Sequence, residues 1–408
     1  MGAGTAQRGA CLLISGKVRK NMEFVVFAGV LLLLFIFMIV QELIQTKNQE
    51  KLFKKYLREN YGKEPPKEYS LERFARLGSY LERHKEEKQL DDITWNDLGM
   101  DEVFRRIDRT YSAAGEEYLY YTLRNISCGR EALEHLEEVV NWLQEQENIK
   151  VRIQLLMKRL GHLGKYSLYD YLDNLDYLGE RSNRKIVLGN LLYLPFLLLL
   201  FVQPAMGTIG IVLCMLWHIM TYFREKKVIE PYIISFAYVL RLIDVCEELE
   251  KQKIPAYRRE LDELREALKS LRELRRGAYW VMAGNQGKIG GNPLDILADY
   301  LRMILHLDIF QFNRMLEKLR KKTGQVETML AITGYLDMAI SVGGFRKSLE
   351  GYCIPKLEED TEKAFLHMKK GWHPLLSQPV KNSIRADRGI LLTGSNASGK
   401  STFLKMVA

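Results

Sequence analysis

An uninterrupted stretch without a formal charge, residues 186–223, constrains this chain more than any other feature of its sequence. A single helix over these 38 residues would measure about 57 Å, roughly twice the hydrocarbon thickness of a bilayer. Two helices fit, with Gln203-Pro204 and Gly207 at the turn, because proline interrupts a helix and glycine permits a tight bend. We therefore expect a transmembrane helical hairpin at 186–223. The alternative is a helical hairpin buried in a soluble core.

A shorter apolar segment near the N-terminus predicts a further span. Phe24–Val40 carries no charge and would form a helix of about 26 Å. A cleaved signal peptide is the alternative, but the apolar run is long for one and no small-residue cleavage site follows it. We expect a tail at 1–23 and an uncleaved transmembrane helix at 24–44.

The basic residues around the hairpin predict its orientation. Cytoplasmic loops of membrane proteins are enriched in lysine and arginine. Basic residues flank the hairpin on both sides, which places both of its ends in the cytoplasm: Arg181, Arg184, Lys185, Arg224, Lys226 and Lys227. We expect a multi-pass protein of the cell membrane whose soluble regions face the cytoplasm. The basic tail at 1–23 leaves the orientation of the first helix open.

The soluble segments show helical periodicity. We expect helical regions at 45–185 and 224–345, the first opening with a basic amphipathic helix at 45–60. That helix can approach anionic membrane lipid or can simply be solvated. A later apolar run predicts a bundle helix, with a coiled-coil lever as the alternative: Leu261, Leu264, Leu268, Leu271 and Leu274.

The composition favours an anionic partner without naming it. Sixty lysines and arginines against 51 acidic residues give a formal charge of +9, which suits anionic lipid, nucleic acid or a mixed solvated surface. The five cysteines show neither a CxxC pair nor a zinc-ligand pattern. We expect neither a disulfide nor a metal cluster.

The C-terminal residues contain the most specific motif. Gly394, Gly399, Lys400 and Ser401 match GxxxxGK[ST], the pattern of a phosphate-binding loop. The apolar run 390–392 before it predicts a buried strand, and a helix should open at Ser401. An ordinary glycine turn is the alternative. The motif predicts that 346–408 is the beginning of an α/β P-loop ATPase domain.

The chemistry of such a loop assigns its residues. Glycines let successive N–H groups point at phosphate oxygens, Lys400 reaches the β- and γ-phosphates of ATP, and the Ser401 hydroxyl ligates Mg²⁺. The candidate cofactor-binding residues are Gly394, Ser395, Asn396, Ala397, Ser398, Gly399, Lys400, Ser401 and Thr402. No residue is assigned a catalytic role. Because no acidic motif follows before Ala408, we expect a truncated chain whose ATP hydrolysis belongs to the full-length protein.

Thr393–Thr402 resembles the ATP loop of the MutS family of mismatch-repair ATPases, which usually reads TGPNMGGKST. Upstream segments resemble further motifs of this family in the family's order: Ile107–Thr110 with Gly115 and Leu123, Leu336-Asp337, Tyr352–Pro355, Gly371–Leu376 and Val380–Ile384. The histidine of the segment Gly371–Leu376, His373, carries over as a motif position only, and we interpret it as part of a structural His-Pro turn.

The resemblance covers about 91–175 and 228–408. It implies a mainly α fold, in which a helical core and lever region is interrupted by a transmembrane hairpin and followed by the start of the P-loop domain. It also implies ATP binding, homodimerisation and a possible DNA partner (duplex, mismatched or branched). The chain departs from the family pattern in one respect, because we recognise no mismatch-reading domain before the core in the given sequence. Two other functions stay open: a transport ATPase subunit with fused membrane helices, and a non-catalytic membrane scaffold.

Overall fold

The computed structural model describes residues 37–38, 40–41, 44–63, 69, 71–86, 88–126, 129–163, 167–275, 300–358, 365–396 and 398–408. The chain divides into two compact units, residues 1–60 and 61–408. The expected transmembrane helix at 24–44 lies mostly outside the described residues.

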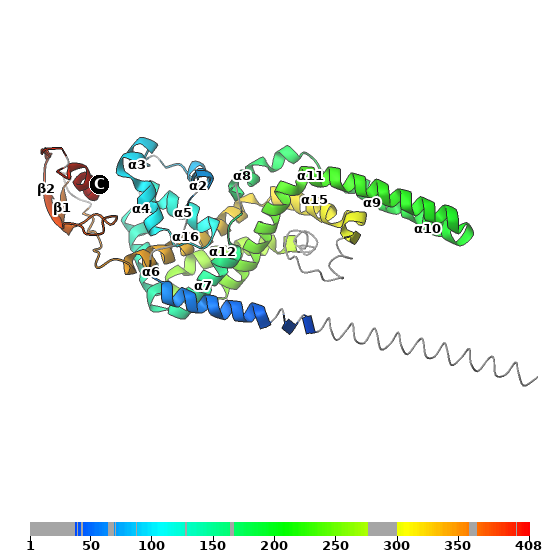
Figure 1. The fold of residues 1–408 in the computed structure, drawn as a ribbon, viewed down its shortest axis with the longest axis horizontal. Coiled ribbons are helices and arrows are strands. Elements are labelled where there is room, and N and C mark those ends of the chain that lie inside the picture. Colours follow the sequence, from blue (N-terminus) through cyan, green and yellow to red (C-terminus); the bar gives the residue numbers. More distant parts are fainter. Residues whose placement is uncertain are drawn as a thin grey trace, which may run out of the picture. The chain divides into compact units, whose positions relative to one another are not determined.

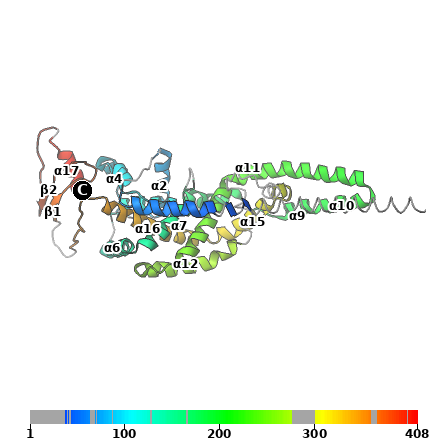
Figure 2. The same ribbon diagram turned by 60° about the horizontal axis from the view of Figure 1, so that its bottom comes forward.

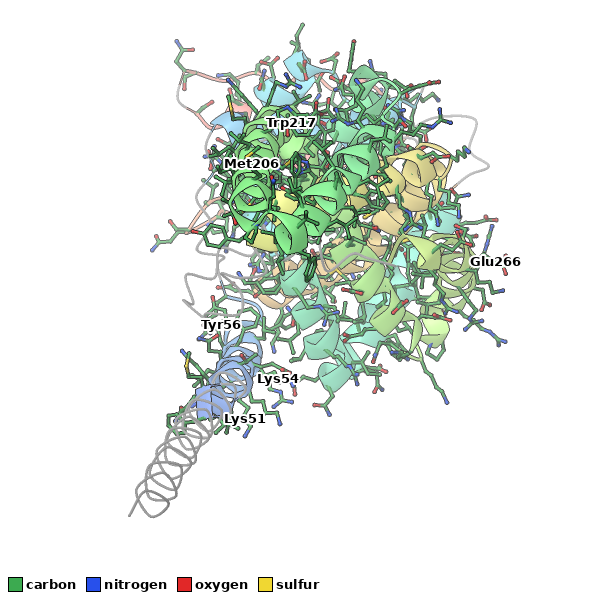
Figure 3. All side chains as sticks on the ribbon, turned by 90° about the vertical axis from the view of Figure 1, so that its right-hand side faces the viewer. Lys51, Lys54, Tyr56, Met206, Trp217 and Glu266 are labelled. Atoms are coloured by element: carbon green, nitrogen blue, oxygen red, sulfur yellow. The ribbon has the colours of Figure 1, made fainter. Side chains whose placement is uncertain are left out.

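The first unit contains the expected basic helix. Residues 44–60 are helical, and Lys54 pairs with Glu50 at 2.6 Å one turn away. Such i,i+4 pairs support an exposed helix. Lys51, Lys54 and Tyr56 project from it (Figure 3). The sequence prediction of a helix is confirmed here.

The second unit is mainly helical with one small sheet. Its α-helices are α2 Leu71–Arg83, α3 Asp92–Leu98, α4 Met100–Ile107, α5 Ala113–Arg124, α6 Arg130–Glu145, α7 Glu147–Leu160, α8 Leu168–Asp173, α9 Arg184–Leu191, α10 Tyr193–Val202, α11 Pro204–Glu250, α12 Arg258–Leu271, α15 Leu307–Arg320, α16 Thr323–Lys347 and α17 Lys400–Val407. Short 3₁₀ helices cover Asn174–Leu178, Pro255–Tyr257 and Arg272–Arg275. Strands β1 (Leu366–Gly371) and β2 (Asn382–Ala386) pair antiparallel. The predicted mainly helical class is confirmed.

The larger of two hydrophobic core clusters joins the segments before and after the hairpin. It contains Val140 of α6, Leu156 of α7, Phe236 of α11, Leu264 of α12 and Leu336 of α16, all buried. Removing such side chains from water is the main stabilising term of a fold. The described residues within 61–185 and 224–345 are therefore parts of one helical body (Figure 1).

The leucine run after the hairpin forms a bundle helix. Four of its five leucines lie on α12, which packs against α16, and all five are buried: Leu261, Leu264, Leu268, Leu271 and Leu274. The preferred prediction is confirmed, and a free coiled-coil arm at this position is excluded.

The hairpin consists of α9 and α10 on one side and the first half of α11 on the other. Its turn is at Gln203, and Pro204 opens α11 at the position where a missing N–H has no cost. The break between α9 and α10 precedes Pro195, which cannot donate to the carbonyl of Leu191. The predicted break at Gln203-Pro204 is confirmed.

Gly207 does not form the turn, contrary to the sequence prediction. It lies in the first helical turn of α11, where a β-carbon would come within 2.6 Å of the Leu200 backbone N. At Gly210 a β-carbon would approach the Phe196 ring to 2.0 Å. These two glycines let α10 and α11 pack closely, because a side chain at either position would push the helices apart.

The hairpin exposes an apolar surface. The 19 residues Arg184–Val202 and the 47-residue α11 are long and apolar enough to cross a membrane, and α16 meets the same criterion. Their burial differs: 72% of the most apolar window of α16 is buried, against 6% for Arg184–Val202. Helix α16 is therefore the centre of the helical body, whereas the hairpin presents its side chains outward.

Helix α11 connects the hairpin to the core without a break. Its 47 residues correspond to about 70 Å of continuous helix. The helix can be followed along its length in Figure 2. Met206 and Trp217 are exposed on its hairpin half (Figure 3). Phe236 and Ile243 are buried on its core half. The helix continues past Phe223, where the sequence predicts the end of the hairpin.

A carboxyl group is enclosed in the core beside α8. Glu117 of α5 is 3% exposed and accepts a hydrogen bond from the Ser167 hydroxyl at 2.9 Å. Burial raises the pKa of Glu117 from 4.5 to about 8, because desolvation penalises the ionised form, while Ser167 and Arg76 act in the opposite direction. The folded chain therefore holds this side chain protonated at neutral pH.

This protonation makes stability depend on pH. Between about pH 4.5 and 8 the folded state binds one more proton at Glu117 than the unfolded state, so stability falls as the pH rises through this window. We expect Glu117→Gln to resemble the wild type at pH 5 and to melt higher at pH 8, in thermal unfolding of the detergent-solubilised chain. The exposed Glu138→Gln serves as control. Parallel pH profiles for wild type and Glu117→Gln would contradict the prediction.

Candidate functional site

The motif residues form a loop that leads into the last helix. Gly399 adopts φ +87° at the N-cap of α17, a left-handed conformation that disfavours any residue with a β-carbon. A β-carbon at Gly394 would lie 2.9 Å from the Ser398 hydroxyl oxygen. The helix opens at Lys400, one residue before the predicted start. Its first N–H groups have no partner within the helix and are available to an anion.

Lys400 folds back over this loop. Its Nζ donates to the carbonyl oxygen of Gly394 at 2.6 Å and also to that of Ser395. The Ser398 hydroxyl lies 3.5 Å from the same nitrogen. The Lys400 ammonium group therefore points into the loop. Its N–H groups could donate to phosphate oxygens instead of to these two carbonyls.

The remaining predicted site residues lie along the same segment. Ser395, Asn396, Ser401 and Thr402 are all exposed, whereas Ala397 lies outside the described residues. The structure therefore brings Gly394, Ser398, Gly399 and Lys400 together in one loop, and leaves the hydroxyls of Ser401 and Thr402 at its solvent side.

The predicted strand before the loop is not formed in the structure. Residues 390–392 have no strand assignment, and Leu391 is 88% exposed. A buried strand needs neighbours that supply its hydrogen bonds and cover its faces. In the described part of the chain β1 and β2 pair only with each other, so residues 390–392 lack such neighbours. A P-loop α/β domain is accordingly not seen among the described residues.

His373 holds a turn between β1 and β2. The Leu375 N–H donates to His373 Nδ1 at 3.3 Å, and the Leu376 N–H donates to the His373 carbonyl at 3.2 Å. Burial, and then the nearby Lys405, lower the pKa of His373, so the ring stays neutral and can accept. The geometry agrees with the predicted structural His-Pro turn.

Two motif segments that are far apart in sequence meet at the N-terminus of α5. The buried Asp337 of α16 accepts from the Ser112 N–H at 2.8 Å, the Ser112 hydroxyl at 2.6 Å and the Tyr111 N–H at 3.0 Å. A carboxylate at a helix N-terminus satisfies N–H groups that lack helical partners and interacts favourably with the helix dipole. We call this contact the α5–α16 junction.

Glycines allow the two helices of the junction to approach. A β-carbon at Gly115 would lie 2.4 Å from Asp337 Oδ2, and one at Gly334 would lie 2.6 Å from the Ala114 carbonyl oxygen. Neither space can hold a side chain without moving the backbone. Gly115 is therefore required by the close contact of α5 with α16.

A second layer of hydrogen bonds extends the junction toward α4. The Ser341 hydroxyl of α16 donates to the Ile107 carbonyl at 2.8 Å and accepts from the Arg109 N–H at 2.7 Å. Asp108 accepts from the Thr110 N–H at 2.9 Å and from its hydroxyl at 2.6 Å. The Ile107–Thr110 segment is thus fixed to α16 by its backbone.

Sequence reasoning identified Gly115 and Asp337 as motif positions but missed the part of Ser112 and Ser341. Serine before a helix is a common N-cap, and Ser112 does accept from the Gly115 N–H at 3.1 Å. That local signal could have predicted the cap. Its second partner, 225 positions away, could not be predicted from local sequence.

Comparison with known proteins supports a relationship to the MutS family. The chain is 28% identical over 116 residues to MutS protein homolog 4 of Homo sapiens and 29% identical over 116 residues to MutS protein homolog 4 of Mus musculus. Each match covers 26% of this chain and 12% of the relative, so the chain spans about an eighth of the length of these proteins. No family model matches the chain.

At the α5–α16 junction, we expect a single added methyl group to lower the stability of the fold. We expect Gly115→Ala to lower stability by about 1–3 kcal/mol, because the added carbon overlaps the Asp337 carboxylate. Gly78→Ala on α2 is a matched control: a β-carbon there meets nothing within 4 Å, so alanine should be neutral or stabilising by about 0.5–1 kcal/mol. Thermal unfolding of both variants in detergent checks this. Equal melting midpoints would refute the proposed packing at the junction.

Proposed function

We propose that this chain is the membrane-anchored part of a MutS-like ATP-binding protein, with Mg-ATP held at residues 394–402. The observation that carries the proposal is the Lys400 ammonium folded over a glycine loop at the start of α17. In this role the loop amides and Lys400 bind the phosphates, and the Ser401 hydroxyl ligates the magnesium ion. ATP hydrolysis is proposed for the full-length protein, as a dimer.

The proposal places the hairpin in the membrane. Its support is the row of large apolar side chains exposed along both arms, including Leu198 at 68% and Phe201 at 89%. A contiguous apolar surface of this kind costs free energy in water and is stabilised in lipid. Both ends of the hairpin then lie on the cytoplasmic side, with the ATP loop, as the flanking basic residues favour.

The helical body provides the proposed coupling between the loop and the membrane. Helix α11 runs from the hairpin into the core, where it packs against α16, and α16 carries the junction residue Asp337. A movement of the core on nucleotide binding would therefore reach the hairpin through continuous helix. DNA is the proposed partner by resemblance to the MutS family, and stimulation of ATP hydrolysis by duplex or branched DNA would support it.

Nucleotide binding is tested at the lysine. We expect Lys400→Ala to weaken Mg-ATP binding by at least about tenfold, because a charge-assisted hydrogen bond to phosphate contributes about 1.5–3 kcal/mol. Lys405→Ala, on the exposed face of the same helix, should bind like the wild type. Titration of the purified full-length protein with a fluorescent ATP analogue measures both. Wild-type affinity in Lys400→Ala would contradict the proposed site.

Membrane topology is tested at the hairpin turn. In intact cells, a membrane-impermeant maleimide should label Gln203→Cys at the exposed turn, because the turn lies on the outer side of the membrane. The native exposed Cys353 is an internal control and should be labelled only after permeabilisation. Mass spectrometry of the labelled peptides separates the two sites. Labelling of both sites only after permeabilisation would show that the hairpin does not cross the membrane.

A further inference from the structure

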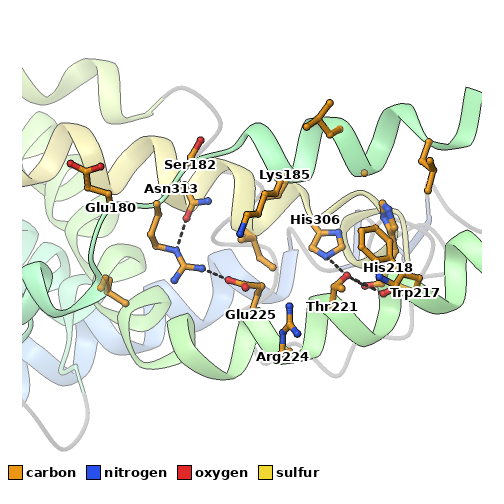
Figure 4. A pocket seen from close by; sticks show the side chains of 17 residues that line it. Glu180, Ser182, Lys185, Trp217, His218, Thr221, Arg224, Glu225, His306 and Asn313 are labelled. Atoms are coloured by element: carbon orange, nitrogen blue, oxygen red, sulfur yellow. Dashed lines mark hydrogen bonds and ion pairs between the residues drawn. The ribbon is translucent and has the colours of Figure 1, made fainter.

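A cavity of about 670 Å³ lies between the hairpin arms where they join the helical body. Its walls come from α9, from the middle of α11 and from the start of α15 (Figure 4). The volume is within the range of pockets that hold small organic ligands. We call it the hairpin-base pocket.

Two cations in this pocket have no acidic partner among the residues that the structure describes. Arg181 is engaged, since its Nε donates to Asn313 Oδ1 at 3.0 Å and its guanidinium pairs with Glu225. Lys185 on α9 and Arg224 on α11 also line the pocket, and neither makes an ion pair with any described residue. Two unpaired cations on opposite arms are suited to bind one phosphate group.

A buried histidine offers a hydrogen-bond acceptor to the same pocket. His218 is 1% exposed, and its Nδ1–H donates to the Ile304 carbonyl at 2.7 Å, which leaves Nε2 as the unprotonated nitrogen. Within the described part of the chain Nε2 has no partner, and it faces Gly189, where a β-carbon would lie only 3.1 Å away. A buried acceptor without a donor calls for a ligand group that donates.

One wall of the pocket is apolar and continues onto the outer surface of the hairpin, while Glu180, Ser182 and Thr221 add polar groups to the lining. Leu188 is 67% exposed, Leu192 is 46% exposed and Trp217 is 50% exposed, and all three line the pocket. A ligand that fits these walls has a charged end and a hydrocarbon end. Tryptophan beside basic residues is typical of the level of the lipid headgroups.

We propose that the hairpin-base pocket binds one anionic glycerophospholipid. Its phosphate lies between Lys185 and Arg224, a headgroup hydroxyl donates to His218 Nε2, and an acyl chain follows Leu188 and Leu192 along the hairpin. This proposal rests on the proposed insertion of the hairpin in the membrane. A soluble phosphate ester shares the headgroup chemistry but leaves the apolar wall uncovered.

The test uses Trp217 as reporter. The full chain is reconstituted in phosphatidylcholine vesicles that contain a few per cent of phosphatidylglycerol, and bromine is placed on the acyl chains of one lipid or the other to quench tryptophan fluorescence. Trp217→Phe identifies the Trp217 contribution. We expect quenching per brominated phosphatidylglycerol to exceed that per brominated phosphatidylcholine by about tenfold or more, since each cation near the headgroups contributes about fivefold.

Matched double variants separate a pocket from general attraction. Lys185→Gln with Arg224→Gln should abolish the preference for phosphatidylglycerol. Arg184→Gln with Lys227→Gln removes the same charge from the same two helices, outside the pocket, and should retain the preference. An equal loss in both pairs would show diffuse surface attraction and overturn the proposal.

Three further outcomes would also overturn it, each in a distinguishable way. Strong but equal quenching by both lipids would leave the membrane hairpin standing and remove the pocket. Quenching by neither lipid would show that the hairpin lies outside the bilayer, and the proposed membrane anchor would fall with it. Loss of the preference on adding micromolar glycerol phosphate would assign the pocket to a soluble phosphate ester.

Discussion

The hydrogen bonds between Asp337 and the N-terminus of α5 connect the two parts of the chain that the hairpin separates. The carboxylate is buried and takes its donors from Tyr111 and Ser112, more than 200 residues away. The cost of burying the charge is offset only when such hydrogen bonds are made. Gly115 and Gly334 allow the approach, so the geometry of α5 against α16 is tightly specified. The packing of the surrounding core depends on this geometry.

Packing of α11 in this core connects the hairpin mechanically to the helical body. Helix α11 has its apolar first half exposed and its second half buried among α7, α12 and α16. A long helix fixed at one end transmits displacement to the other, and Pro231, which leaves the Lys227 carbonyl without its helical hydrogen bond, is the point between the two halves where α11 can bend. In the proposed function, the position of the hairpin in the membrane and the conformation of the core would influence each other.

The sequence predicted those features whose signals are local. The uncharged run at 186–223 identified the hairpin, Pro204 its turn, and the glycine-lysine spacing the loop at 394–402. Features that depend on distant partners could not be read in this way. Gly207 looked like a turn residue, yet its function is the close packing of α10, which only the folded hairpin reveals.

The strand expected at 390–392 shows that a clear local signal can also fail to predict the structure. Its apolar residues are typical of a buried strand, but a strand forms only when a neighbouring strand supplies hydrogen bonds. The described residues contain no strand that pairs with 390–392. The hairpin-base pocket was not anticipated for a related reason. Lys185, His218, Arg224 and the carbonyl of Ile304 come from three separate segments, and none of them has a distinctive local pattern.

Hydrogen exchange of the full-length protein in lipid nanodiscs, with and without Mg-ATP, tests whether the loop at 394–402 binds nucleotide. We expect slower exchange of the backbone amides at 394–403 when Mg-ATP is bound, because phosphate oxygens accept their hydrogen bonds. The amides of α10 and the first half of α11 should exchange slowly in both states, since lipid surrounds them. Unchanged exchange at 394–403 at saturating Mg-ATP would show that this loop does not bind the nucleotide.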